Sequence, residues 1–131
     1  GMTDVAHTPH SYYISRYPAG REATVYEGAI DLQFRNDSSH PVKIVTSVGG
    51  GEVTVSLMGV KTVSVDSVNG GRWAETQPHE QVVSGADCIP SSGIPGFTTS
   101  DTRIISDLSG NTLSQETQTT VYDPQPIVRC R

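Results

Sequence analysis

Apolar side chains recur at every second position through much of the chain, which is the spacing of β-strands with one buried face. In Glu52–Leu57, for example, Val53, Val55 and Leu57 fall on one side and are expected to be buried. The same alternation predicts strands at Ser11–Tyr17, Ala29–Arg35 and Val63–Val65. Extended runs next to turn signals predict further strands at Ala23–Tyr26, Val42–Val48, Phe97–Ser106 and Thr112–Tyr122, where enrichment in Thr and Val suits exposed strands. We therefore expect an all-β fold with little helix, mainly an antiparallel meander followed by a C-terminal β-hairpin unit.

Glycine-rich segments separate these strands at the places where a chain must turn. Gly49–Gly51 joins two alternating runs and predicts a hairpin, because glycine tolerates the positive φ angles that tight turns require. Asn69–Gly71 is a second turn signal, and Asp107–Asn111 is a third. Together these signals predict a β-meander over residues 23–68.

The pattern divides the chain into three parts. Residues 1–72 read as the first β domain, although residues 1–9 are polar and look like an irregular connector. Residues 73–81 show neither a helical nor a strand period and are interpreted as a linker or irregular crossing, with Trp73 as a core plug or lid. Residues 82–131 read as a second β unit.

Composition excludes several functional classes. The net charge is −5 and the basic residues are scattered, so a nucleic-acid partner is not expected. No long apolar run or signal-peptide pattern is present in this stretch. The length of 131 residues is enough to bury a core without a metal or cofactor, and no metal-ligand spacing appears.

The two cysteines, Cys88 and Cys130, flank the last third of the chain. A disulfide between them would hold the terminal strand in place and, in the chain-entropy model, stabilise the fold by roughly 4 kcal/mol. The alternative is two unpaired thiols in a cytosolic protein. Neither cysteine has the partners that a catalytic thiolate requires.

The stretch His10–Ile44 contains several short motifs. They are the HS pair at His10, the YPAGREATV turn, the G-x-x-D of Gly28 and Asp31, the F-R-N-D of Phe34–Asp37, and Pro41-x-x-Ile44. In combination they resemble the VanW-like family of bacterial cell-envelope proteins. The last third is more loosely similar to G-five type extracellular modules, through Gly96-Phe97, Thr102-Arg103 and Val121–Pro124.

The resemblance implies an extracellular or cell-envelope protein, with a secreted or membrane-anchored parent, that acts on peptidoglycan stem peptides. The family is linked to vancomycin resistance by name and to L,D-transpeptidation through a cysteine in an upstream glycine-rich segment. That segment is not among these residues, so we expect the C-terminal part of the domain, inactive by itself. By this resemblance His10 is the candidate general base, with Asp31 as a candidate to orient it.

Three residues around the Pro-Ala-Gly turn are candidates for substrate binding: Arg16, Arg21 and Glu22. A guanidinium matches a carboxylate bidentately, as the end of a stem peptide would require. Glu22 departs from the family pattern, in which many relatives carry Asp.

Each of these residues also has a structural interpretation. His10 is equally explained as a surface histidine that caps a turn, and His7, His40 and His79 are interpreted as surface groups. Arg21 would then pair with Glu22, Glu27 or Asp31 to fasten the turn, and Asp31 would satisfy an arginine.

Two functional hypotheses follow. The first is a transpeptidase domain without its nucleophile, and the second is a non-catalytic wall-binding or scaffold module. Because a partial domain exposes a sheet edge or apolar strip, we also expect a homo-oligomer or strand exchange through the N-terminal edge.

Overall fold

The structure, a computed structural model, describes residues 1–131, and all of its regular elements are β-strands. In chain order they are β1 (Thr3–Ala6), β2 (Gln33–Arg35), β3 (Lys43–Gly49), β4 (Glu52–Met58), β5 (Ser64–Thr76), β6 (Glu80–Val83), β7 (Ser91–Ile94), β8 (Gly96–Ser106), β9 (Thr112–Tyr122) and β10 (Gln125–Cys130). The all-β prediction is confirmed. No helix has the length and hydropathy needed to cross a membrane.

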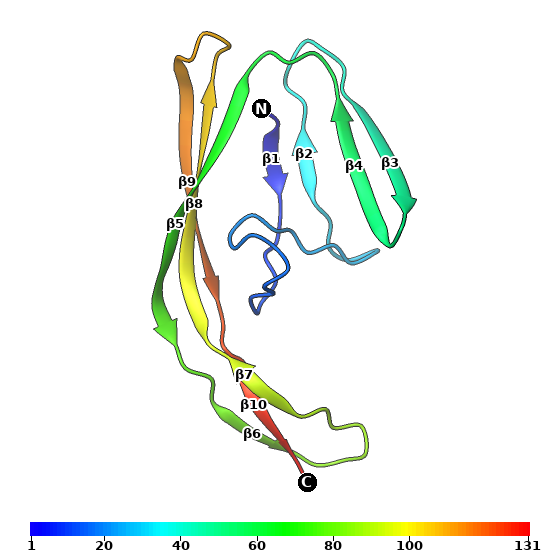
Figure 1. Ribbon diagram of the computed structural model, residues 1–131, viewed down its shortest axis with the longest axis vertical. Helices are drawn as coiled ribbons and strands as arrows, with labels where there is room; N and C mark the ends of the chain where they lie inside the picture. Colours follow the sequence, from blue (N-terminus) through cyan, green and yellow to red (C-terminus); the bar gives the residue numbers. More distant parts are fainter.

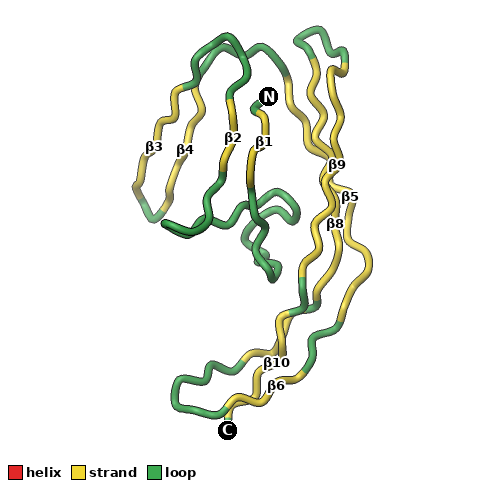
Figure 2. Tube along the Cα trace, turned by 180° about the vertical axis from the view of Figure 1, so that it is seen from behind, coloured by secondary structure: helices red, strands yellow, loops and turns green.

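The strands form four small sheets. Two have two strands, β1–β2 and β3–β4, and two have three strands, in the orders β5–β8–β9 and β6–β10–β7. All pairs are antiparallel except β10 with β6. The two three-stranded sheets follow one another in a long curved spine, and β1–β4 lie beside its upper part (Figure 1). The view from behind shows the same separation of spine and N-terminal layer (Figure 2).

The buried part of the molecule lies in the central spine strands, β8 and β9. Phe97 and Tyr122 are its large apolar members, and Thr99, Asp101 and Thr120 are also buried. Only six of the 131 residues are buried, so the fold depends on a small core and on sheet hydrogen bonds. Residues on β8 at alternate positions point the same way, which places Phe97, Thr99 and Asp101 on one face.

An aromatic cluster attaches the N-terminal segment to this core. The ring of Tyr13 packs edge-on against Phe97 and Tyr122, with ring centroids 5.1 and 5.5 Å apart. The guanidinium of Arg72 lies 4.5 Å from the Tyr13 ring centroid and 4.1 Å from that of Phe97. Such edge-to-face and cation–π contacts each contribute about 1 kcal/mol, so they hold the loop after β1 against the spine.

The predicted hairpins are confirmed. β8 and β9 pair from Phe97 with Tyr122 to Ser106 with Thr112, and the Asp107 carboxylate closes their turn by accepting from Ser109 N at 2.9 Å. β3 and β4 pair in full register around the glycine loop. Cys88 and Cys130 form the expected disulfide, which fixes β10 next to β6.

The N-terminal predictions are partly wrong. Ser11–Tyr17 forms turns instead of a strand, because its side chains are used to pack on the spine and no neighbouring strand is available to pair with it. Ala23–Tyr26 is also not a strand, although Tyr26 and Ile30 form one bridge. Thr3–Ala6, expected to be irregular, is strand β1 because Gln33–Arg35 lies beside it as a pairing partner.

The predicted meander over residues 23–68 is wrong as well. The β3–β4 hairpin forms a sheet of its own, and β5 pairs instead with β8, with partners 20 to 42 positions apart in the sequence. Asn69–Gly71 is an irregularity inside β5, where the Asn69 side chain accepts a hydrogen bond from Gly71 N at 2.9 Å. The turn residues therefore distort the strand locally, but β5 continues beyond them because both flanking parts pair with β8.

The segment 73–81 is more regular than expected. β5 continues to Thr76 and β6 begins at Glu80, so only residues 77–79 lie outside strands and position 72 falls within β5. Trp73 is 46% exposed and does not fill a core. The ladder to β8 supplies the backbone pairing that the irregular side-chain pattern concealed.

Candidate functional site

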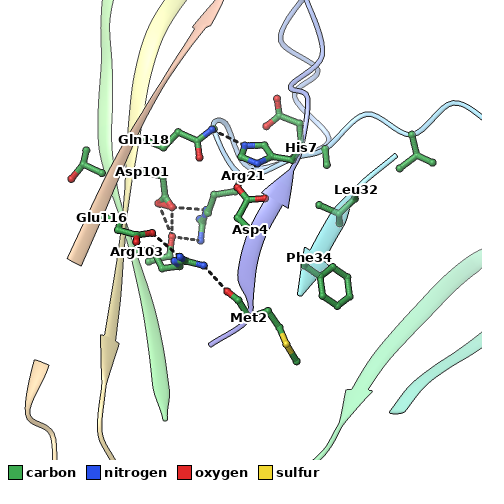
Figure 3. Close-up of a pocket in the computed structure, with 16 residues that line it drawn as sticks. Met2, Asp4, His7, Arg21, Leu32, Phe34, Asp101, Arg103, Glu116 and Gln118 are labelled. Carbon is green, nitrogen blue, oxygen red and sulfur yellow. Dashed lines mark hydrogen bonds and ion pairs between the residues drawn. The ribbon is translucent and has the colours of Figure 1, made fainter. Parts of the chain in front are cut away.

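A cavity of about 740 Å³ lies between the N-terminal segment and the β8–β9 face of the spine. It is lined by Met2, Asp4, His7, Gly20, Arg21, Glu22, Ala23, Val25, Leu32, Phe34, Ser67, Asp101, Arg103, Glu116, Thr117 and Gln118. Its charged side chains come from both walls: from residues 4–22 on one side and from β8 and β9 on the other (Figure 3). The cavity therefore exists only because two distant parts of the chain pack together.

Arg21 crosses this cavity to reach the spine. Its Nη1 donates to Ser67 Oγ at 3.2 Å, and Ser67 Oγ in turn donates to Asp101 Oδ1 at 2.5 Å. Arg21 Nε lies 3.9 Å from Asp101 Oδ2. Because Asp101 is buried, its negative charge needs this cation and this hydroxyl for compensation. The Arg21 side chain nevertheless stays 44% exposed, with part of its guanidinium facing the cavity.

Arg103 lies two residues further along β8, on the same face. Its Nη2 donates to Glu116 Oε2 at 2.6 Å across the β8–β9 ladder, where the two residues are directly paired. Its Nη1 donates to the carbonyl oxygen of Met2 at 2.9 Å. Arg103 therefore ties the start of β1 to the spine and shapes one end of the cavity (Figure 3).

His7 is held between two polar partners. Its Nδ1 lies 2.6 Å from Asp4 Oδ2, and the Gln118 amide nitrogen lies 2.6 Å from its Nε2. Each ring nitrogen of the imidazole therefore has a polar partner. His7 thus connects the loop after β1 to β9 and forms part of the cavity wall (Figure 3).

Glu22 and Tyr122 close the base of the cavity. The Tyr122 hydroxyl donates to Glu22 Oε1 and accepts from Gly20 N at 2.7 Å. Burial, and secondly the bond to the Glu22 carboxylate, raises the pKa of Tyr122 well above its ordinary value. Glu22 Oε2 is buried and has no hydrogen-bond partner. A buried acceptor without a donor is costly, and because this oxygen is inaccessible to solvent, a ligand in the cavity would meet the rest of the Glu22 side chain instead.

The sequence-predicted residues separate into two groups. Arg21 and Glu22 line the cavity, whereas His10, Arg16 and Asp31 do not. His10 Nδ1 lies 3.2 Å from the backbone nitrogen of Tyr12, a turn-capping contact. Asp31 accepts from Gln33 Nε2 at 2.9 Å, and Arg16 is an exposed side chain. The structure therefore does not bring His10 and Asp31 together with Arg21.

Arg21 also has other partners than expected. Sequence reasoning paired it with Glu22, Glu27 or Asp31, but it contacts Ser67 and Asp101 instead. Arg21 therefore attaches the turn to the spine and does not form an ion pair within the turn.

Several residues of the cavity were not identified from the sequence: Asp4, His7, Asp101, Arg103, Glu116 and Gln118. One signal for them was available, since charged residues at alternate positions, as in Asp101 and Arg103, mark a polar strand face. Asp4 lies in β1 and His7 in the loop that follows it, and this three-residue spacing carries no comparable signal.

The cavity holds no complete catalytic set. No group of three or more His, Cys, Asp or Glu side chains is placed to hold a metal ion. Both cysteines are paired, so these residues offer no thiolate nucleophile. What the arrangement offers is a partly engaged guanidinium, the Glu22 side chain and an imidazole held by Asp4 and Gln118 around one space.

Residues 1–58 match the family described as VanW like protein. This N-terminal segment is similar to VanW-like proteins. The match contains His10–Ile44, the stretch that carried the resemblance, and ends at the last residue of β4. It supports the association with vancomycin resistance that the resemblance implied, and nothing in it supports a similarity to G-five modules. No curated protein and no solved structure matches the chain.

Proposed function

We propose that this chain is a peptide-binding module of a cell-envelope protein, and that the cavity between its VanW-like segment and the spine binds peptidoglycan stem peptides. The observation that carries the proposal is the pairing of two incompletely engaged groups of opposite charge in one space. Arg21 offers donors toward a ligand carboxylate, and Glu22, which lines the same cavity, offers a negative charge toward a ligand amine.

Stem peptides present both kinds of group on a short, flexible chain. A ligand carboxylate would form a fork with the exposed part of the Arg21 guanidinium, while an amino group would be attracted by the negative charge of Glu22 in the same cavity. Leu32, Phe34 and Val25 supply apolar contact surface for small side chains. The mixed lining suits a small zwitterionic peptide better than a polyanion, because acidic residues share the cavity with both arginines.

A non-catalytic role is better supported than a transpeptidase role. The transpeptidase hypothesis needs a thiol and a histidine within hydrogen-bond reach of it, and His10 bonds to the turn that follows it. The disulfide is compatible with the oxidising environment of a secreted or membrane-anchored envelope protein. Binding to the wall, as part of a resistance-associated envelope protein, requires neither a thiol nucleophile nor a histidine beside it.

The proposal is tested by titrating the 131-residue protein with purified, soluble stem peptides in a calorimeter. We expect wild-type binding that Arg21→Ala weakens at least tenfold and that Arg21→Lys restores only in part, because lysine keeps the charge but loses the fork. Arg16→Ala is the matched control, since Arg16 belongs to the same segment but lies outside the cavity. Absence of wild-type binding, or equal losses in the Arg16 and Arg21 variants, would contradict the proposal.

A second measurement separates binding from catalysis. A longer form of the protein that carries the family's upstream glycine-rich segment with its cysteine is incubated with two stem peptides of different mass, and the mixture is examined by mass spectrometry for a joined product. Unchanged peptides are expected. A joined product that depends on His10 would instead favour the transpeptidase hypothesis.

A further inference from the structure

The β3–β4 hairpin has one face made almost entirely of apolar side chains. Register places Ile44 opposite Leu57, Thr46 opposite Val55, and Val48 opposite Val53, all on the same side of the ribbon. The opposite side carries the pairs Val45–Ser56 and Ser47–Thr54. The sequence predicted a buried face here, and the structure leaves it open.

The apolar members of this face are exposed to an unusual degree. Exposed fractions are 55% for Ile44, 81% for Val48, 72% for Val53, 61% for Val55 and 53% for Leu57. An isolated two-stranded hairpin is marginally stable in water and normally needs a packed face. The β3–β4 sheet has only two strands, and it makes no ladder with β2 or β5. A cover from outside the chain would remove this surface from water.

We propose that the cover is a second copy of this chain, and that two hairpins stack apolar face to apolar face around a two-fold axis. The self-complementarity of the face supports this occupant. In the antiparallel stack the larger Ile44 and Leu57 at the base of one hairpin meet the smaller Val48 and Val53 at the tip of the other. Thr46 and Val55, midway along the hairpin, lie next to the axis, as an isologous contact requires.

Area and charge agree with this arrangement. Five such side chains expose on the order of 500 Å² of apolar surface per copy, so two copies would bury about 1,000 Å², the lower bound for a specific interface. Residues 43–58 contain one lysine and one glutamate, so the two faces approach without net repulsion despite the overall charge of −5. Stacked sheets pack about 10 Å apart, a distance that these aliphatic side chains fill.

The test is a concentration series of the full chain by sedimentation velocity, with two neighbouring substitutions on β4. Val53→Glu places a charge on the apolar face, and Thr54→Glu places the same charge on the other face of the same strand. We expect a wild-type dimer at micromolar to submillimolar concentration, a monomer for Val53→Glu, and a dimer for Thr54→Glu. A wild-type monomer throughout the series, or a dimer that Val53→Glu leaves intact, would overturn the proposal.

A cross-linking experiment keeps the proposal testable if Val53→Glu fails to fold. Thr46→Cys places a thiol next to the proposed axis, and Ser47→Cys places one on the opposite face of the same strand. Mild oxidation should give a covalent dimer with Thr46→Cys at least fivefold faster than with Ser47→Cys. Equal rates for the two variants would rule out face-to-face stacking.

Discussion

Tyr122 donates a hydrogen bond to the carboxylate of Glu22 across 100 positions of sequence. The same hydroxyl accepts a hydrogen bond from Gly20 N. One phenol at the end of β9 therefore fixes both Gly20 and Glu22 in the turn that lines the cavity. The spine thereby determines the conformation of a loop in the VanW-like segment.

Replacing Tyr122 with Phe tests the strength of this link. The change removes the donor to Glu22 and the acceptor for Gly20 N and leaves both groups without partners, which should lower the free energy of unfolding by about 1–3 kcal/mol. Denaturant unfolding measures the loss. Tyr26→Phe is the matched control, because Tyr26 is 70% exposed and should be nearly neutral. Equal stability of the two variants would show that the Tyr122 hydroxyl contributes nothing.

Alkaline titration provides a second test of the same group. The pKa of Tyr122 is raised in the folded protein by burial and by Glu22, so above pH 10 the unfolded chain loses this proton while the native protein keeps it. The stability contribution is complete below the ordinary pKa of 10.0 and declines as pH rises above it. Tyr122→Phe should therefore reduce the alkaline loss of stability, which urea unfolding at several pH values above 10 measures.

Acid should weaken the β8–β9 turn. The side chain and backbone of Asn111 donate to the Asp107 carboxylate, each at 2.8 Å, and these bonds lower its pKa below the ordinary 3.8. The resulting stability is present above pH 3.8 and is lost as pH falls through the folded pKa. Asp107→Ala should therefore lower stability at neutral pH and flatten its acid dependence. Asp87→Ala, at an exposed carboxylate, should do neither.

The disulfide should stabilise one end of the spine selectively. Cys88 and Cys130 close a loop with a sequence separation of 42, which in the chain-entropy model corresponds to about 4 kcal/mol. Reduction should lower the unfolding midpoint and increase hydrogen exchange in β6, β7 and β10 before β8 and β9. The Cys88→Ser, Cys130→Ser double variant should not respond to reductant. Uniform exchange along the whole spine would contradict a local role.

The C-terminal hairpin was predictable because its signals are local. Two eleven-residue strands, rich in Thr, meet at a turn whose Asp107 carboxylate bonds to nearby backbone, so the local turn signal and the structure agree. The segment Ser11–Tyr17 alternates apolar and polar residues, but its conformation is set by Tyr13 packing on Phe97 and Tyr122. Packing against a distant core cannot be recognised from the apolar and polar pattern of the segment itself.

The candidate site was predictable only on one side. Arg21 and Glu22 stand out in the sequence because charged groups flank a Pro-Ala-Gly turn, and both line the cavity. Their partners, Asp101 and Tyr122, belong to strands that the topology brings to the turn from the other end of the chain. Pairing between remote strands decides which charges meet, and that information is absent from the spacing of residues around Arg21.

Two glycines with almost the same backbone conformation provide the sharpest test of the cavity base. Gly20 has φ +78° and Gly28 has φ +77°, so alanine should cost about 1–2 kcal/mol at each through strain alone. At Gly28 an added methyl meets nothing within 4 Å, whereas at Gly20 it would lie 3.3 Å from the methyl group of Thr99, which is fully buried and has little room to move. Gly20→Ala should therefore be more destabilising than Gly28→Ala by about 1 kcal/mol or more. Urea denaturation of the two variants measures the difference, and equal losses would mean that the turn does not pack against β8 as the structure describes.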